Sequence, residues 1–127
     1  MLVVQFLKYY QVDTIDNMQI DNIGFIKIDV EGHEISVLKG SQKSIEKFSP
    51  NFLIEIEERH KPGAINTILS FLSKFDYLGF YFVENKLIKM NLVKKNLKND
   101  FSGKRINNFI FLSSHNLSSA DIIKRFS

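Results

Sequence analysis

Runs of apolar residues alternate with polar, turn-forming clusters along this chain of 127 residues. The run Phe25–Val30 is mainly apolar, which is typical of a strand buried inside a sheet. An acidic turn follows it, then a helical segment over Glu34–Lys39, and Gly40 marks the expected end of that helix. The stretch Asn22–Gly40 therefore predicts a strand, a tight turn and a helix, with carboxylates gathered where the strand ends.

The same reading of apolar periodicity predicts the other elements. The amino-terminal stretch Leu2–Val12 is apolar and aromatic with some alternation, as in one strand or two short ones. The further predicted elements are a helix over Ser41–Phe48, a strand over Phe52–Glu57, a helix over Ile65–Phe75, strands over Gly79–Val83 and Asn108–Leu112, and a helix over Ser118–Phe126.

The order of these elements predicts the fold class. Helices link the strands Phe25–Val30 and Phe52–Glu57, so these two strands should be parallel. No amphipathic helix separates Gly79–Val83 from Asn108–Leu112, so we expect an antiparallel pair joined by a long loop. The prediction is an α/β fold in one domain over residues 1–127, whose mixed sheet has parallel central strands and an antiparallel final pair.

Composition narrows the class of protein. The chain has no Cys, which excludes disulfides and thiolate chemistry. No apolar run reaches the ~18 residues of a membrane span, and the amino terminus lacks the features of a signal peptide, so we expect a cytoplasmic protein without a membrane partner. Residues 85–107 carry six Lys and one Arg against one Asp. With one aromatic residue, Phe101, this segment favours a solvated loop over a nucleic-acid platform.

The acids after Phe25–Val30 are the first candidates for a functional site. Asp29 and Glu31 are two residues apart, so both can face a crevice at the strand end, or they can bond backbone N–H groups at the helix start. His33 is a candidate general base, because imidazole titrates near neutral pH. A surface or capping role is the alternative for His33. Glu34 is best explained as a first-turn acid that complements the helix dipole.

A second group of candidates surrounds the next strand. Lys27 can form an ion pair with Asp29 or Glu55 across neighbouring strands. Glu57 can reach the same rim as Glu55, and the residues at positions 59 and 60 either bind an anionic group or lie in a solvated loop. The carboxylates and histidine of this region also suit a divalent cation, but their spacing is no recognised ligand motif, and we expect no metal.

The string FIKIDVEGHEISVLKG, followed by NFLIEIE, resembles the FkbM-type family of S-adenosylmethionine-dependent methyltransferases. That family has a strand ending in Lys-x-Asp-x-Glu-Gly, a Glu two positions later, a Leu-x-Gly helix end and a downstream strand ending in Glu. The matching positions are Lys27, Asp29, Glu31, Gly32, Glu34, Leu38, Gly40 and Glu55, and Thr14-Ile15-Asp16-Asn17 resembles the family's upstream Thr-Leu-Asp-Asp element.

The resemblance implies a Rossmann-like methyltransferase sheet. Asn22–Val30 would be its fourth strand, Phe52–Glu57 its fifth, and Gly79–Val83 with Asn108–Leu112 its antiparallel sixth and seventh. The implied activity is O-methyl transfer from S-adenosylmethionine to a sugar, a glycan or a secondary metabolite. The residues that the resemblance places near the acceptor are Asp29, Glu31 and His33 as catalytic candidates, with Lys27 and Glu55 as substrate-binding candidates.

One part of the family pattern has no counterpart in this chain. The family's cofactor site uses a glycine-rich turn after its first strand, because only glycine lets the backbone approach the ligand closely. The six glycines lie at positions 24, 32, 40, 63, 79 and 103, never two within one tight turn. The resemblance therefore implies the carboxyl-terminal part of a methyltransferase domain, without its cofactor-binding first half. The alternative is a non-catalytic remnant or a partner subunit.

This arrangement has a physical consequence for the sheet. In the family's strand order the fourth strand pairs with the missing first strand, so Phe25–Ile28 would be an apolar, unpaired edge. Such an edge favours association with a second copy or a complementing chain. The alternative is that the amino-terminal segment LVVQF folds back and covers the edge.

Overall fold

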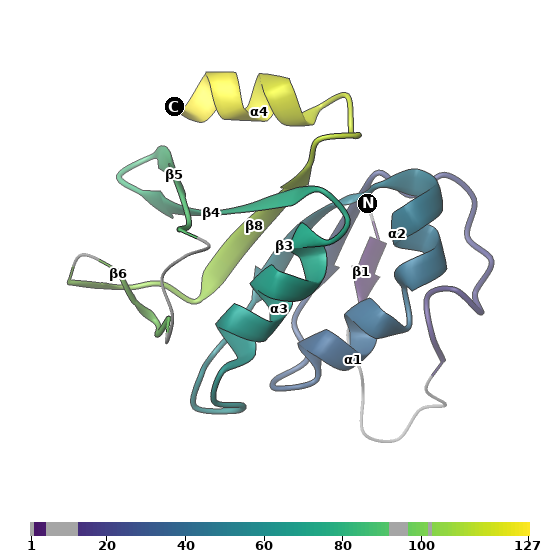
Figure 1. Ribbon diagram of the computed structural model, residues 1–127, viewed down its shortest axis with the longest axis horizontal. Coiled ribbons are helices and arrows are strands. Elements are labelled where there is room, and N and C mark those ends of the chain that lie inside the picture. The colour runs from purple at the N-terminus through teal and green to yellow at the C-terminus, as the bar shows by residue number, and fades with distance from the viewer. Residues whose placement is uncertain (1, 5–12, 92–96, 102) are drawn as a thin grey trace.

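The computed structural model describes residues 2–4 (backbone only), 13–91, 97–101 and 103–127, which form a mixed sheet with helices on both faces (Figure 1). In chain order the elements are β1 (Leu2–Val4), β2 (Phe25–Ile28), α1 (Glu34–Lys39), α2 (Gln42–Phe48), β3 (Asn51–Glu55), α3 (Ala64–Ser73), β4 (Tyr77–Val83), β5 (Lys86–Lys89), β6 (Asp100–Phe101), β7 (Lys104–Arg105), β8 (Asn108–Ser113) and α4 (Ser119–Phe126).

The six strands of the main sheet follow the order β1-β2-β3-β8-β4-β5. β1, β2 and β3 are parallel, and β8, β4 and β5 continue the sheet with antiparallel pairing. The predicted mixed α/β class is confirmed, as are the parallel pair β2–β3 and the antiparallel pair β4–β8. The predicted helices all form, within two residues of the expected bounds.

Alternate residues along the strands point to opposite faces of the sheet. α1, α2 and α3 cover one face, where the main core includes Ile26, Phe52 and Phe111, all fully buried. α4 covers the other face above the antiparallel strands. The cluster beneath α4 consists of Phe80, Leu87 and Leu112 with the partly buried Leu78, Ile110, Ile122, Ile123 and Phe126.

β1 lies against β2, in register from Leu2 opposite Ile26 to Val4 opposite Ile28. The expectation that Phe25–Ile28 is an unpaired edge is therefore wrong, and the fold-back alternative is the arrangement observed. β1 forms the outer edge on this side of the described sheet, so the arrangement does not require association through β2. Residues 5–12 of the predicted strand region lie outside the described residues.

The segment between β4 and β8 is more structured than the predicted long loop. β5 forms a hairpin with β4, closed by Glu84 and Asn85, whose φ angles of 51° and 65° suit the mirror-image turn of two-residue hairpins. β6 and β7 form a second, short hairpin. The expectation of a loop was wrong because Glu-Asn is a weaker turn signal than the usual Asn-Gly or Asp-Gly.

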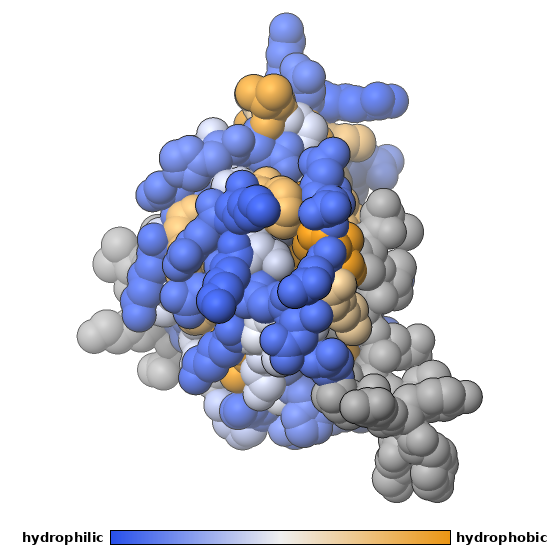
Figure 2. All heavy atoms as spheres, turned by 90° about the vertical axis from the view of Figure 1, so that its right-hand side faces the viewer, coloured by the Kyte–Doolittle hydropathy of each residue, from blue (hydrophilic) through white to orange (hydrophobic). Residues whose placement is uncertain are grey.

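The Thr14–Asn17 element binds α2 to the rest of the fold. The Asp16 carboxylate accepts hydrogen bonds from the N–H groups of Lys43 and Ser44 at 3.0 and 2.9 Å and from the Ser44 hydroxyl at 2.7 Å. This part of the family resemblance therefore has a structural role, as the cap of a helix start. Figure 2 shows this side of the molecule, where hydrophilic surface separates small apolar areas.

Gly40 ends α1 for a different reason from the one expected. Its φ of −74° is not left-handed, so conformational freedom does not require glycine here. A Cβ at Gly40 would instead lie 2.9 Å from Cγ2 of Thr14, closer than real contacts allow.

In the described part of the chain, no helix is long and apolar enough to cross a membrane.

Candidate functional site at the carboxyl ends of β2 and β3

The turn after β2 has an unusual backbone. Glu31 and Gly32 both have positive φ, 45° and 97°, and the His33 N–H group closes the turn on the Val30 carbonyl at 3.4 Å. Glycine suits its position, but a glutamate with positive φ costs free energy, and such strain gathers at functional sites. Gly32 also packs closely, since a Cβ there would lie 3.3 Å from Cβ of His60. The turn therefore fixes Glu31 and brings the segment after β3 against it.

A hollow of about 90 Å³ opens at this turn. We call it the acidic rim, and its lining residues are Asp29, Glu31, Glu34, Glu55, Glu57, Arg59 and His60. The side chains come from β3, from the ends of β2 and β3 and from the start of α1. They converge because parallel strands end at the same edge of a sheet, where the following helices begin.

Asp29 and Glu55 form a carboxyl pair within the acidic rim. Asp29 follows Ile28, which lies opposite Ile54 in the parallel register, so the two acids are neighbours across the sheet. The pKa of Glu55 is raised by burial, by the negative charges of Asp29 and Glu57, and by its hydrogen bond with Asp29, while the positive charge of Lys27 opposes the shift. A neighbouring negative charge disfavours ionisation, so Glu55 holds its proton more readily than an isolated acid.

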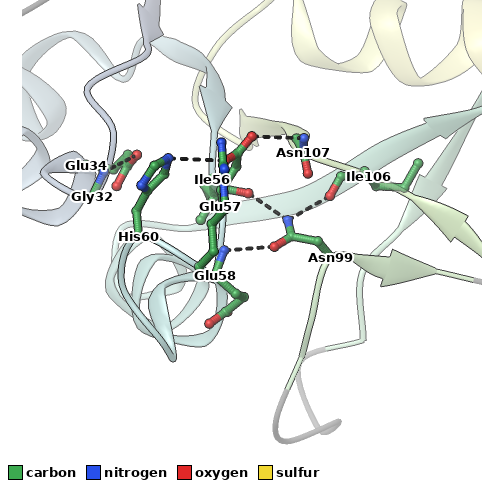
Figure 3. A network of polar contacts seen from close by, with 10 residues as sticks. Gly32, Glu34, Ile56, Glu57, Glu58, His60, Asn99, Ile106 and Asn107 are labelled. Carbon is green, nitrogen blue, oxygen red and sulfur yellow. Dashed lines mark hydrogen bonds and ion pairs between the residues drawn. The ribbon is translucent and has the colours of Figure 1, made fainter.

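Glu57 is the anchor of the acidic rim. One carboxylate oxygen contacts Arg59 and His60, the latter at 3.1 Å, and the other accepts a hydrogen bond from the Asn107 amide at 3.2 Å (Figure 3). The hydrogen bond from Arg59 lowers the pKa of Glu57 against the effect of burial, and the charges of Arg59, His60 and Arg105 lower it further. Glu57 therefore stays ionised and holds the two basic side chains in place.

Glu34 has the structural role that the sequence favoured. It is 2 % exposed, and its Oε1 accepts a hydrogen bond from the Gly32 N–H group at 3.1 Å (Figure 3). This contact fixes the turn from the side of the helix, as first-turn acids do. Glu34 thus stabilises the turn that presents Glu31.

The other predicted site residues are divided between two places. His33 is exposed and lines a separate hollow of about 590 Å³ together with Thr14 and Ser36, so it does not join Asp29 and Glu31. Lys27 is exposed, near enough to Glu55 to affect its titration. The histidine that does reach the acidic rim is His60.

Sequence reasoning gave too little weight to Glu57, Arg59 and His60, which it assigned to a reachable rim or a solvated loop. The sequence did contain one signal, because Glu57 ends the predicted strand that follows β2. Parallel neighbouring strands end at the same edge of a sheet, so Glu57 was expected near the acids that follow β2. What the sequence does not contain is the close packing of Gly32 on His60. Among the described residues, no three His, Asp or Glu side chains are arranged to hold a metal ion.

Comparison with known families assigns this strand, turn and helix to a class of protein, the methyltransferases. Residues 8–79, more than half of the chain, match the methyltransferase FkbM domain. The chain belongs to the FkbM methyltransferase family, as the motif around Asp29 indicated. Comparisons with curated proteins and with solved structures gave no match.

Members of this family generally use S-adenosylmethionine. The acidic rim, at about 90 Å³, is far smaller than the ~300 Å³ or more of sites that enclose small molecules. Its carboxylates suit a single donor group, such as a hydroxyl or an ammonium, and the rim does not fit a whole S-adenosylmethionine.

Proposed function

We propose that this chain provides the acceptor side of an S-adenosylmethionine-dependent O-methyl transfer. The observation that carries the proposal is the Asp29–Glu55 carboxyl pair at the ends of β2 and β3, inside the segment that matches the FkbM domain. Within a Rossmann-like methyltransferase fold, the described sheet corresponds to the second half, with β2 and β3 as its fourth and fifth strands.

The chemistry of the acceptor explains why a carboxyl pair is useful. A hydroxyl group becomes a good nucleophile as it loses its proton, and a positioned carboxylate is a suitable general base. S-adenosylmethionine, when bound, supplies the methyl group. In this chain, Asp29 and Glu55 share a position where one ionised oxygen accepts the proton of the acceptor hydroxyl, and Glu31 orients a neighbouring hydroxyl. The acceptor class that fits several carboxylates is a polyhydroxylated molecule such as a sugar or glycan.

The roles of Glu57 and His60 follow from their contacts. Glu57 is ionised and bound by three partners, so it positions Arg59 and His60 and is not the base. His33 remains a second candidate base on the separate hollow, and Lys27 a substrate contact on the open side of Glu55. Separate substitution of His33 and of His60 shows which of the two histidines contributes to methyl transfer.

The test measures methyl transfer from labelled S-adenosylmethionine to a panel of sugars and glycans. We expect Asp29→Asn and Glu55→Gln to lower the rate by about 10² or more, the usual contribution of a general base. Neither substitution should lower the melting temperature, because each removes a charge from a repulsive pair. Glu46→Gln, an exposed acid on α2, is the matched control and should keep full activity.

A second candidate function is a non-catalytic remnant or a partner subunit that retains the second half of the fold. The small volume of the acidic rim and the absence of a glycine-rich turn in the sequence favour it. Titration with S-adenosylmethionine separates the two candidates. Binding with turnover supports the enzyme, and no binding by this chain supports the remnant or subunit.

A further inference from the structure

Another hollow, of about 460 Å³ and separate from the one lined by His33, adjoins the acidic rim. We call it the basic hollow, and its lining residues are Glu58, Arg59, Lys98, Asn99, Asp100, Gly103 and Arg105. Arg59 lines both hollows, so one ligand can contact the two at once. The volume lies within the ~300–1,000 Å³ typical of small-molecule sites.

The side chain of Asn99 fixes the backbone around the basic hollow. Its amide N–H groups donate to the carbonyls of Ile56 and Ile106 at 2.7 and 2.8 Å, and its Oδ1 accepts from the Glu58 N–H group at 2.8 Å (Figure 3). Asn99 is 9 % exposed. One buried side chain therefore ties the segment after β3 to the segment that contains the β6–β7 hairpin.

Each cation of the basic hollow is the direct sequence neighbour of a residue in this network. Arg59 follows Glu58, Lys98 precedes Asn99, and Arg105 precedes Ile106. The network thus fixes the backbone beneath three positive side chains, one in the segment after β3 and two in the segment of the β6–β7 hairpin. Such preorganisation lowers the entropy cost of binding a ligand between them.

The two acids of the basic hollow are occupied by backbone N–H groups. The Glu58 carboxylate binds the start of α3, accepting from the N–H groups of Gly63 and Ile65, the latter at 3.1 Å. Asp100 accepts from the Gly103 N–H group at 3.0 Å within the β6–β7 turn. The Glu58 carboxylate is buried by its contacts, whereas Asp100, Lys98 and Arg105 are exposed, so one accessible acid accompanies the cations.

We propose that the basic hollow binds an oxyanion of the acceptor, a carboxylate or a phosphate monoester, held by Arg59, Lys98 and Arg105. Guanidinium groups bind both oxyanions through paired N–H donors, and the Lys98 ammonium adds a third positive charge. The acceptor would then be an acidic or phosphorylated polyhydroxylated molecule, with its reactive hydroxyl over the acidic rim. The choice of acceptor rests on the proposed function, whereas the binding of the oxyanion does not.

The experiment is a nuclear magnetic resonance titration of the full chain with three sugars that differ in charge. Glucose-6-phosphate and glucuronate carry the two oxyanions, and glucose is their neutral counterpart. We expect one or both anions to shift the amide signals of Lys98, Asn99, Gly103 and Arg105, and to bind at least about tenfold more tightly than glucose, as expected for a charge-assisted hydrogen bond. Higher ionic strength should weaken the binding.

Matched substitutions assign the binding to the basic hollow. Arg105→Gln and Lys98→Gln should each weaken anion binding about tenfold, whereas Arg105→Lys should retain part of it. Lys124→Gln, which removes an exposed cation on α4, should leave binding unchanged. Circular dichroism of each variant reports whether it is folded.

The proposal is overturned if neither anion binds at millimolar concentration, if glucose binds as tightly as the anions, or if Lys124→Gln weakens binding as much as Arg105→Gln. The outcome is separate from that of the proposed function. Anion binding without any methyl transfer supports this site and rejects the enzyme, and methyl transfer without any anion binding does the opposite.

Discussion

In the parallel half of the sheet, β1, β2 and β3 end at one edge, and acids at the ends of β2 and β3 face one another across the acidic rim. In the antiparallel half, β8, β4 and β5 end alternately at opposite edges, so no such group of acids forms among the described residues. Two buried asparagines help to join the two halves instead. Asn51 and Asn99 bind residues more than 40 positions away in the sequence.

This difference separates side chains that build the fold from side chains available for chemistry. The asparagines satisfy buried backbone groups, which are costly to leave unpaired. The acids of the rim lie close together, and burial first, then the negative charges of Asp29 and Glu57, raise the pKa of Glu55. Repulsive groups kept close together at a strand end are typical of functional sites. Four substitutions test this difference between structural and functional side chains, and we give them from the largest expected effect to the smallest.

Asn99→Ala should lower the free energy of unfolding by about 3 kcal/mol. The change leaves the carbonyls of Ile56 and Ile106 and the Glu58 N–H group without their partner, and unpaired buried groups cost 1–3 kcal/mol each. Urea denaturation measures the loss. Asn17→Ala is the exposed control and should cost far less. An equal loss in the two variants would show that Asn99 does not join the halves.

Asn51→Ala should cost about 2 kcal/mol, again through lost hydrogen bonds. Asn51 is 1 % exposed, and its Oδ1 accepts from the Ser113 N–H group at 2.9 Å and from the Ser119 hydroxyl at 3.1 Å. These bonds connect β3 to β8 and to the start of α4. Hydrogen exchange should therefore show faster opening of α4. Unchanged protection of α4 would contradict this role.

Asp16→Asn should cost about 1 kcal/mol at neutral pH, because the amide keeps one acceptor oxygen but loses the second acceptor and the charge. Burial acts to raise the pKa of Asp16, but hydrogen bonds from Ser44 and Lys43 outweigh it and hold the pKa below its ordinary value of 3.8. The contribution of a lowered carboxyl pKa is complete above the unfolded value and disappears as pH falls through the folded value. Denaturation of both proteins over acid pH should show the difference vanishing, and a constant difference would exclude the charged cap.

Glu31→Gly should raise the free energy of unfolding slightly, by about 0.5 kcal/mol, because glycine tolerates the φ of 45° and the gain exceeds its entropy cost. Thermal denaturation measures the gain. Methyl transfer should fall in the same variant, since its carboxylate leaves the rim. Loss of stability together with activity would show that Glu31 is a structural residue.

Much of the fold could be predicted from local pattern. Amphipathic periodicity located the four helices, and apolar runs located β2, β3, β4 and β8, because these segments carry their own burial signal. β5, β6 and β7 were missed. They are short strands in which charged residues accompany only a few apolar ones, and their pairing depends on the turn at Glu84-Asn85 and on Asn99, which bonds to Ile56 far along the chain.

The candidate site could be predicted in part. The motif identified the family and placed Asp29 and Glu31 at a strand end, and both line the acidic rim. It also grouped His33 with them, whereas the side chain of His33 lines another hollow. Glu31 and His33 are only two residues apart in the turn, yet they face different sides, and sequence spacing does not reveal which side each one faces.

Local sequence pattern was enough to identify the family, the strand, turn and helix around Gly32, and the gathering of acids where β2 ends. These features depend on short-range geometry, which a motif encodes directly. The tertiary structure decided the pairing of β1 with β2, the Asp29–Glu55 pair and the arrival of His60 at the rim. It also placed the basic hollow beside the acidic one. Each of these depends on contacts between distant segments, whose register is set by the packing of the whole core.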